Sequence, residues 1–208
     1  GEVTVIVAES EMGQGPFTLL PMMVAEELEV PWESIRVERA PLKAVYGYQM
    51  TGGSSSIRKG WATLRQAGAI ARELLVQTAA SHWQVPAHAC HAELGSVIHR
   101  ESGKQASYAE LVPEASELPI PQTALLKEPD EFSIIGTPAP RTDSPDKING
   151  RARFGIDTKL PGMRYATITH CPVFGGTPKT IHAEAALAIK GVLDAVSYTH
   201  LTLPTTRL

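Results

Sequence analysis

Residues 51–83 read TGGSSSIRKGWATLRQAGAIARELLVQTAASHW, a glycine- and serine-rich loop followed by a long periodic stretch. Its apolar and small side chains recur every three or four residues, which is the spacing of one helix face. This pattern predicts a helix over 55–83, about 40 Å long at ~1.5 Å per residue. Ala67, Gly68 and Ala69 make its middle thin, so another element could approach closely. We therefore expect a long, buried, central helix.

The residues before this helix predict a strand, a helix and a second strand. Residues 2–9 alternate apolar and polar side chains, and 34–39 do the same around Ile35 and Val37. Between them, apolar residues step by three and four over 16–29, and Pro16 suits the first position of a helix. This order predicts a strand–loop–helix unit ahead of the long helix.

The residues after the long helix predict shorter elements and a domain boundary. The expected strands lie at 90–94 and 97–100, which form a hairpin with a turn at Gly95-Ser96, and at 132–135 and 163–168. The expected helices lie at 107–111 (capped by Ser107) and 183–189. A turn is expected at Pro145-Asp146. The proline-rich run near 118–129 indicates an extended linker.

The predicted fold class is α+β, and we divide the chain by changes in pattern. The predicted parts are a first domain at 1–118, a linker at 119–133, a second domain at 134–196, and a non-native tail at 197–208. The tail is set apart because its periodicity does not continue what precedes it.

Composition excludes several classes of protein. The 208 residues carry a net charge of −3 with no run of lysine or arginine, which argues against nucleic acid as a partner. No apolar stretch approaches the ~20 residues of a membrane span. Cys90 and Cys171 form no CxxC pair, so neither a disulfide scaffold nor an iron–sulfur cluster is expected within this chain.

Two loops that precede helices are candidate binding sites. In the first, Gly13 and Gly15 leave backbone amides bare, Gln14 offers an amide donor and a carbonyl acceptor, and the helix start at Pro16 favours an anion. A tight turn that simply needs glycines is an equal alternative.

The second loop, Thr51 to Ser56, is the more specific candidate. Gly52 and Gly53 followed by three serines supply amides and hydroxyls at a helix start, and Ser54 or Ser55 would serve as the N-cap. Arg58 and Lys59 stand in the first helical turn, where cations oppose the helix dipole unless an anion binds nearby. The alternative is an ordinary serine cap with two solvated basic side chains.

Other familiar chemistry does not fit these residues. The first loop lacks the third glycine of a dinucleotide fingerprint, and neither loop has the Gly-Lys-Ser/Thr of a P-loop. His88, Cys90 and His91 do not follow common zinc spacings. Glu26 and Glu27 are interpreted as the polar face of the first helix, and we assign no catalytic residue.

Two motifs in this order resemble the xanthine dehydrogenase and aldehyde oxidase family of molybdenum hydroxylases. They are Ser10-Glu11-Met12-Gly13-Gln14-Gly15, followed by Thr18 and Ala25-Glu26-Glu27-Leu28, and Thr51-Gly52-Gly53-Ser54-Ser55-Ser56. Residues 147–157, 160–166, 171–176 and 183–192 look like the opening of the family's a/b hammerhead domain. A hammerhead that follows the Met-Gly-Gln-Gly segment resembles the branch that contains the beta subunits of isoquinoline 1-oxidoreductases.

The resemblance implies a molybdopterin cofactor, with bacterial members commonly using its cytosine dinucleotide form. Gln14 with Gly13 and Gly15 would hydrogen-bond the pterin. Ser54 and Ser56 would hold the phosphate of the cofactor, in a loop that also contains Thr51, Gly52, Gly53 and Ser55. The implied reaction is hydroxylation of N-heteroaromatic or aldehyde carbons with oxygen from water. Electrons would pass to a partner subunit that carries [2Fe–2S] clusters.

The same resemblance implies that residues 1–118 are a partial molybdopterin-binding domain and that residues 134–196 are an incomplete a/b hammerhead domain. It also implies that the chain is a fragment, inert alone, because the family's general-base glutamate belongs to regions outside it. Two rival hypotheses remain: a non-catalytic anion- or nucleotide-binding module, and a structural piece for subunit assembly. The sequence assigns no compartment and no specific substrate.

Overall fold

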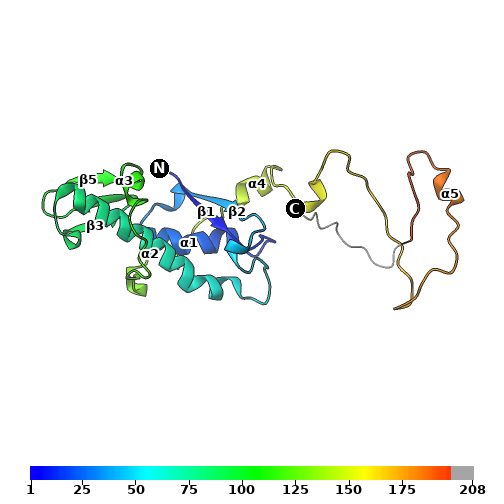
Figure 1. Cartoon of the computed structure of the whole chain (residues 1–208), viewed down its shortest axis with the longest axis horizontal. Helices are drawn as coiled ribbons and strands as arrows, with labels where there is room; N and C mark the ends of the chain where they lie inside the picture. The colour runs from blue at the N-terminus through cyan, green and yellow to red at the C-terminus, as the bar shows by residue number, and fades with distance from the viewer. Residues whose placement is uncertain (198–208) are drawn as a thin grey trace. The chain divides into compact units, whose positions relative to one another are not determined.

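The computed structural model describes residues 1–197 and contains both helices and strands, which confirms the α+β class (Figure 1). The chain forms two compact units, which divide after Arg153. Residues 119–133, predicted as a linker, lie inside the first unit, and the domain boundaries given above stay a prediction. The predicted tail, apart from Ser197, lies outside the described residues.

The first unit opens with a β–α–β arrangement. Strands β1 (Val3–Val7) and β2 (Ile35–Arg39) pair in parallel, with Val3 opposite Ile35, and helix α1 (Pro16–Leu28) connects them. A parallel pair needs such a crossover, because a tight hairpin would make the strands antiparallel. The alternating burial of β1 leaves Val5 and Val7 in the core. The predictions of these three elements are confirmed.

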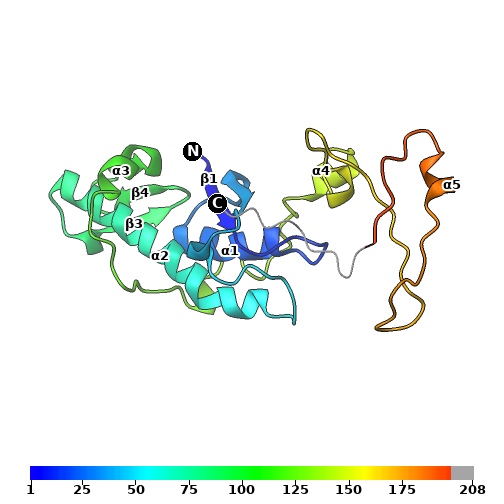
Figure 2. The same ribbon diagram turned by 45° about the vertical axis from the view of Figure 1, so that its right-hand side comes forward.

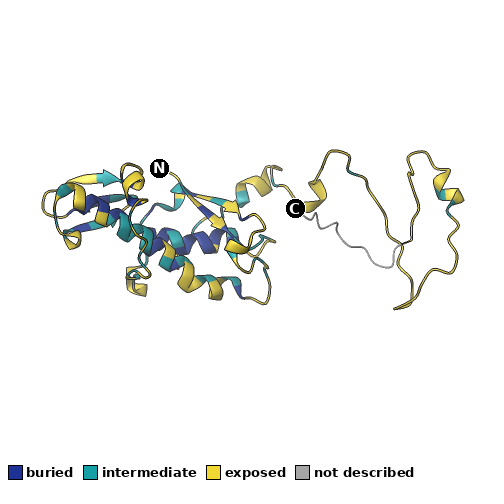
Figure 3. Cartoon of the chain, viewed as in Figure 1, coloured by how far each residue is buried: buried dark blue, intermediate teal, exposed yellow. Residues whose placement is uncertain are grey.

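Helix α2 (Ser56–Trp83) is the longest element, and it packs along α1 (Figures 1 and 2). A Cβ atom added at Gly68 would lie only 2.6 Å from the Val24 carbonyl oxygen. The thin middle predicted from the sequence is therefore the place where α1 approaches. The prediction of a buried helix holds for one face only, because the first turns of α2 are largely exposed (Figure 3).

The second half of α2 carries a small antiparallel sheet and a capped helix. Strands β3 (Cys90–Glu93), β4 (Ser96–His99) and β5 (Gln105–Ser107) lie in the order β3-β4-β5. Helix α3 (Tyr108–Ala115) begins with a capping box, in which the Ser107 hydroxyl accepts from the Glu110 amide. The hairpin and the cap are confirmed, whereas the short strand β5 was not predicted.

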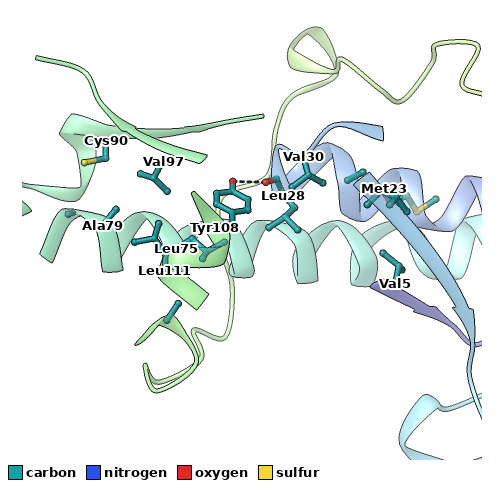
Figure 4. Packing of buried hydrophobic residues seen from close by; sticks show 14 of the residues in the cluster. Val5, Met23, Leu28, Val30, Leu75, Ala79, Cys90, Val97, Tyr108 and Leu111 are labelled. Carbon is teal, nitrogen blue, oxygen red and sulfur yellow. Dashed lines mark hydrogen bonds between the residues drawn. The ribbon is translucent and has the colours of Figure 1, made fainter. Parts of the chain in front are cut away.

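One hydrophobic cluster joins these parts (Figure 4). Leu20 and Met23 of α1, Leu75 of α2 and Val97 of β4 are among its buried members. The Tyr108 hydroxyl donates to the Leu28 carbonyl at 2.7 Å, which ties α3 to the end of α1. Burial raises the pKa of Tyr108, so this donor stays protonated.

The remaining elements are short. They are the 3₁₀ helices η1 (Trp32–Ser34), η2 (Ala44–Tyr46), η3 (Ala87–Ala89), η4 (Pro129–Glu131) and η5 (Gly155–Asp157), and the α-helices α4 (Ser144–Ile148) and α5 (Glu184–Leu187). Helix α5 confirms the helix predicted near 183–189 in shorter form. The turn predicted at Pro145-Asp146 lies within α4 instead.

The strands predicted at 132–135 and 163–168 are wrong for the structure as described. The amides of Ser133, Ile134 and Ile135 donate to the Glu26 carboxylate, so they are not free to join a sheet. Residues 163–168 lie in the second unit, where no described residue is buried. A strand needs a partner and an apolar face to bury, and among the described residues this segment pairs with no strand and buries no side chain.

Within residues 1–197, no helix combines the length and the hydropathy that crossing a bilayer requires.

Candidate functional site

The Gly13–Gln14–Gly15 loop is shaped by a carboxylate of the protein itself. Both glycines have positive φ, +108° at Gly13 and +98° at Gly15. The Glu11 carboxylate accepts from the amides of Gly13 (2.6 Å), Gly15 (3.2 Å) and Phe17 (3.3 Å). The amides that the sequence suggested for an external anion are therefore already satisfied within the loop.

The Gln14 side chain folds back over the same loop. Its Oε1 accepts from the Met12 amide at 2.8 Å, and its Nε2 donates to the Ser10 carbonyl at 3.3 Å. A carboxamide has two donor hydrogens and two acceptor lone pairs, so one of each remains unused. Gln14 is exposed, and these remaining groups are accessible to a ligand.

The second loop leaves the start of α2 open. Gly53 and Ser54 both have positive φ, +61° and +50°. Ser55 occupies the N-cap position, but its hydroxyl donates to the Gly52 carbonyl at 2.9 Å and caps no amide. Ser55 is therefore the N-cap residue, as predicted, although its side chain makes no capping hydrogen bond. Among the residues that the structure describes, no side chain accepts from the first amides of α2.

Space and unused donors surround this helix start. A Cβ atom added at Gly52 or Gly53 would meet nothing within 4 Å. Within residues 1–197, neither the Ser54 nor the Ser56 hydroxyl has a hydrogen-bond partner. The Lys59 ammonium in the first turn stands 4.4 Å from the ring centroid of Tyr48. Bare amides, free hydroxyls and a nearby cation are the chemistry that an anion requires.

The two loops lie side by side. The Thr51 hydroxyl donates to the Ser10 carbonyl at 2.8 Å, so the second loop is bonded to the residue that opens the first. Ser10 and Met12 from one side and Tyr48, Met50 and Thr51 from the other line a shallow hollow. The Ser10 carbonyl also accepts from Gln14 Nε2, so the two loops meet at Ser10 through Gln14 and Thr51, and of the predicted site residues Thr51 alone is among those that line this hollow.

The predicted site residues of the two loops differ in their exposure to solvent. The exposed members are Gly13, Gln14, Gly52, Gly53 and Ser54, the half-buried ones are Thr51 and Ser56, and the buried ones are Gly15 and Ser55.

Glu26 and Glu27 are buried, so their interpretation as a polar face of α1 is wrong. Glu26 accepts from the Lys127 ammonium at 2.7 Å, and Glu27 pairs with Arg65 at 2.7 Å and with Arg72 at 3.5 Å. Burial alone would raise the pKa of Glu26. The Lys127 ammonium and the amides of residues 133–135 outweigh burial and lower it to about 2.

No group of three or more His, Cys, Asp or Glu side chains within residues 1–197 is arranged to hold a metal ion. Cys90 is buried on β3, and burial raises the pKa of its thiol. His91 Nε2 lies 3.6 Å from Glu93, and its buried Nδ1 has no partner within the described residues.

Residues 1–150 match the family described as the molybdopterin cofactor-binding domain. The chain is also similar to three longer curated proteins. It is 34% identical to the beta subunit of isoquinoline 1-oxidoreductase from Brevundimonas diminuta, over 96% of this chain and 31% of that protein. It is 31% identical to a subunit of nicotinate dehydrogenase from Pseudomonas putida, over 92% of this chain and 16% of that protein.

The third relative is the membrane-bound aldehyde dehydrogenase [pyrroloquinoline-quinone] of Gluconacetobacter polyoxogenes, 33% identical over 92% of this chain and 25% of that protein. Quinoline 2-oxidoreductase from Pseudomonas putida 86 aligns in space with a TM-score of 0.48 and 26% identity, over 60% of this chain and 16% of that chain. The chain thus spans less than a third of the length of these curated relatives. Since the family match covers both loops and every buried element, the chain belongs to the molybdopterin cofactor-binding domain family.

Proposed function

We propose that this chain supplies part of the molybdopterin cradle in the large subunit of a molybdenum-dependent oxidoreductase. The observation that carries this proposal is the open start of α2, whose preceding loop is joined through Thr51 to the Ser10 carbonyl, the same carbonyl that accepts from the Gln14 side chain. Membership of the molybdopterin cofactor-binding family supports it.

In this proposal each loop binds a different part of the cofactor. Ser54, Ser56 and the first amides of α2, with Gly52 and Gly53 giving close approach, would hold the phosphate. The unused donor and acceptor of Gln14 would meet the polar edge of the pterin. The Thr51–Ser10 hydrogen bond sets the distance between the two loops, so it fixes how the two ends of one ligand can lie.

The bound cofactor would supply the redox centre for hydroxylation with oxygen from water. This chain's residues would bind and orient it, and we assign no proton transfer to any of them. The substrate class would be N-heteroaromatic or aldehyde carbons, since relatives bear names that refer to isoquinoline, nicotinate and aldehyde.

Three finer features belong to the proposal. The cofactor would take the cytosine dinucleotide form, since the helix start offers room and donors for further phosphate. The electrons would leave through an iron–sulfur subunit, since this chain has only two cysteines, far apart. Residues from about 134 to 196 would complete an a/b hammerhead with chain from the rest of the subunit.

The experiment uses the full-length subunit with its partner. Gln14→Ala and the double variant Ser54→Ala/Ser56→Ala are purified, and molybdenum per subunit is measured by mass spectrometry. On dilution, Ser54→Ala/Ser56→Ala should weaken metal retention at least about tenfold, because a hydrogen bond to a charged group contributes about 1.5–3 kcal/mol. Gln14→Ala should weaken it several-fold, because a hydrogen bond between neutral groups contributes about 0.5–1.5 kcal/mol. Ser116→Ala is the control, an exposed serine whose hydroxyl donates only to the Pro113 carbonyl. Unchanged molybdenum content in both folded loop variants would refute the proposal.

A further inference from the structure

We propose that Glu11 is a positioning residue, held by Arg141, that keeps the Gly13–Gln14–Gly15 loop in the shape that binds the pterin. This inference rests on the proposed function and goes beyond it, since Glu11 itself would touch no cofactor. Its evidence comes from the loop, from Arg141 and from the segment that carries Arg141.

The carboxylate of Glu11 is the internal acceptor of the loop. Only 10% of its side chain is exposed, and it accepts from the amides of Gly13, Gly15 and Phe17. Gly15, at the N-cap of α1, has no side chain to cap the helix. Glu11 takes over that role, with its negative charge at the positive end of the helix dipole.

Arg141 holds this arrangement from the other side. Its Nη2 lies 3.3 Å from a Glu11 carboxylate oxygen, and its Nη1 donates to the Gly13 carbonyl at 3.0 Å. Asp143 accepts two hydrogen bonds from the same guanidinium, at 2.9 and 2.8 Å. Hydrogen bonding to Arg141 holds the pKa of Asp143 well below its usual range, so the carboxylate stays charged.

The segment that carries Arg141 is fixed to α1 by hydrogen bonds from Thr142, and a proline inside α1 makes one of them possible. Pro21 lies inside α1 and has no amide hydrogen, which leaves the Phe17 carbonyl without its helical donor. The Thr142 hydroxyl donates to that carbonyl at 2.9 Å, and the Thr142 amide donates to the Thr18 hydroxyl at 3.2 Å. Arg141 is thereby set beside the loop.

These contacts assign different roles to the two helix starts. The amides at the start of α1 already donate to the Glu11 carboxylate, whose negative charge would repel a phosphate placed there. At the start of α2, no carboxylate from the described part of the chain (1–197) takes this place. The first loop would thus orient Gln14 toward the pterin, while the second takes the phosphate.

The test uses the full-length subunit and two measurements. Amide hydrogen exchange of the peptide that covers residues 11–17 reports the loop, and molybdenum per subunit reports the cofactor. Glu11→Ala should raise exchange in this peptide about tenfold or more, since its bonded amides lose their acceptor, and should lower molybdenum retention several-fold. Arg141→Met should produce smaller changes of the same kind. Glu2→Gln, which breaks the exposed Glu2–Arg36 pair at 2.7 Å, should change neither.

The outcomes separate this inference from the proposed function. If exchange in Glu11→Ala stays at the wild-type level, the carboxylate does not hold the loop and the inference is wrong. If exchange rises but molybdenum is retained, while Gln14→Ala loses it, the inference fails and the proposed function stands. If Gln14→Ala and the double variant Ser54→Ala/Ser56→Ala also retain molybdenum, both fail. Should Glu11→Ala not accumulate as folded protein, Arg141→Met with the carboxylate intact decides between the same outcomes.

Discussion

Gly68 sits where α2 crosses α1, and the backbone of α1 leaves no room for a side chain there. A Cβ atom would lie 2.6 Å from the Val24 carbonyl oxygen and 2.9 Å from the Glu27 Cβ atom. We expect Gly68→Ala to lower the free energy of unfolding of the chain by about 1–3 kcal/mol, as overpacked cores do. The loss should appear although alanine favours helices by about 1 kcal/mol over glycine. Urea unfolding followed by circular dichroism measures it.

Gly60→Ala is the matched control in the same helix. Its added Cβ would meet Leu20 Cδ2 at 3.0 Å and Leu64 Cδ1 at 3.1 Å, which are the ends of flexible side chains. We expect little change or a small gain in stability. Equal losses in the two variants would contradict the view that α1 backbone contact makes Gly68 necessary.

The single residues differ in how well the sequence revealed them. The need for small residues near Gly68 was predictable, because their cluster interrupts an otherwise ordinary apolar stripe. The role of Glu11 was missed, although a carboxylate two residues before a Gly-x-Gly loop start is a usable signal. Glu26 and Glu27 were misread as surface, because their cationic partners Arg65 and Lys127 lie far away along the chain and periodicity does not detect them.

At the scale of elements, the carboxylate of Glu26 fastens the segment around Lys127 and Ile135 to α1. Its pKa is about 2 in the folded chain, against an ordinary value of 4.5. A carboxyl group whose pKa is lower in the folded state than in the unfolded state stabilises the fold fully at pH values above its unfolded-state pKa. This stabilisation is lost as the pH falls to its folded-state pKa. We therefore expect about 3 kcal/mol of stability to disappear between about pH 4.5 and pH 2, at 1.36 kcal/mol per unit.

Urea unfolding at several pH values checks this expectation. Glu26→Gln should be destabilised at pH 6 and should lack this part of the acid-dependent loss, because the amide does not titrate. Glu2→Gln removes an exposed carboxylate and should keep the full pH dependence. An unchanged acid profile in Glu26→Gln would show that other carboxylates govern the loss.

The elements themselves were predictable where local signals decide them. Pro16 at the start of α1, the turn at Gly95 and the Ser107 cap are short-range features, and each marked an element that the structure confirms. The strand predicted at 132–135 failed for the opposite reason. Its apolar residues satisfy the pattern of a strand, but Glu26, distant in sequence, takes its amides.

At the scale of the whole molecule, the described buried residues are confined to the first unit. The core cluster runs from Val5 to Ala115, with Ile134 and Ile135 packed against it. Large apolar side chains of the second unit such as Ile156 (92% exposed) and Tyr165 (80% exposed) are in solvent. The hammerhead expected from about 134 to 196 remains a prediction, because a strand pattern does not reveal whether its partners lie within the same stretch of chain.

This distribution of burial predicts how truncation acts. Removing everything after Arg153 should leave the free energy of unfolding and its dependence on urea unchanged, because both follow the apolar surface that folding removes from water. Removing everything after Leu118 should destabilise the remainder, since Glu26 loses Lys127 and Glu11 loses Arg141, and a buried carboxylate without its partner costs about 3–5 kcal/mol. Urea unfolding of the two truncated chains beside the full chain measures both effects. If the Arg153 truncation loses as much stability as the Leu118 truncation, residues after Arg153 contribute burial to the core, and the first unit does not fold by itself.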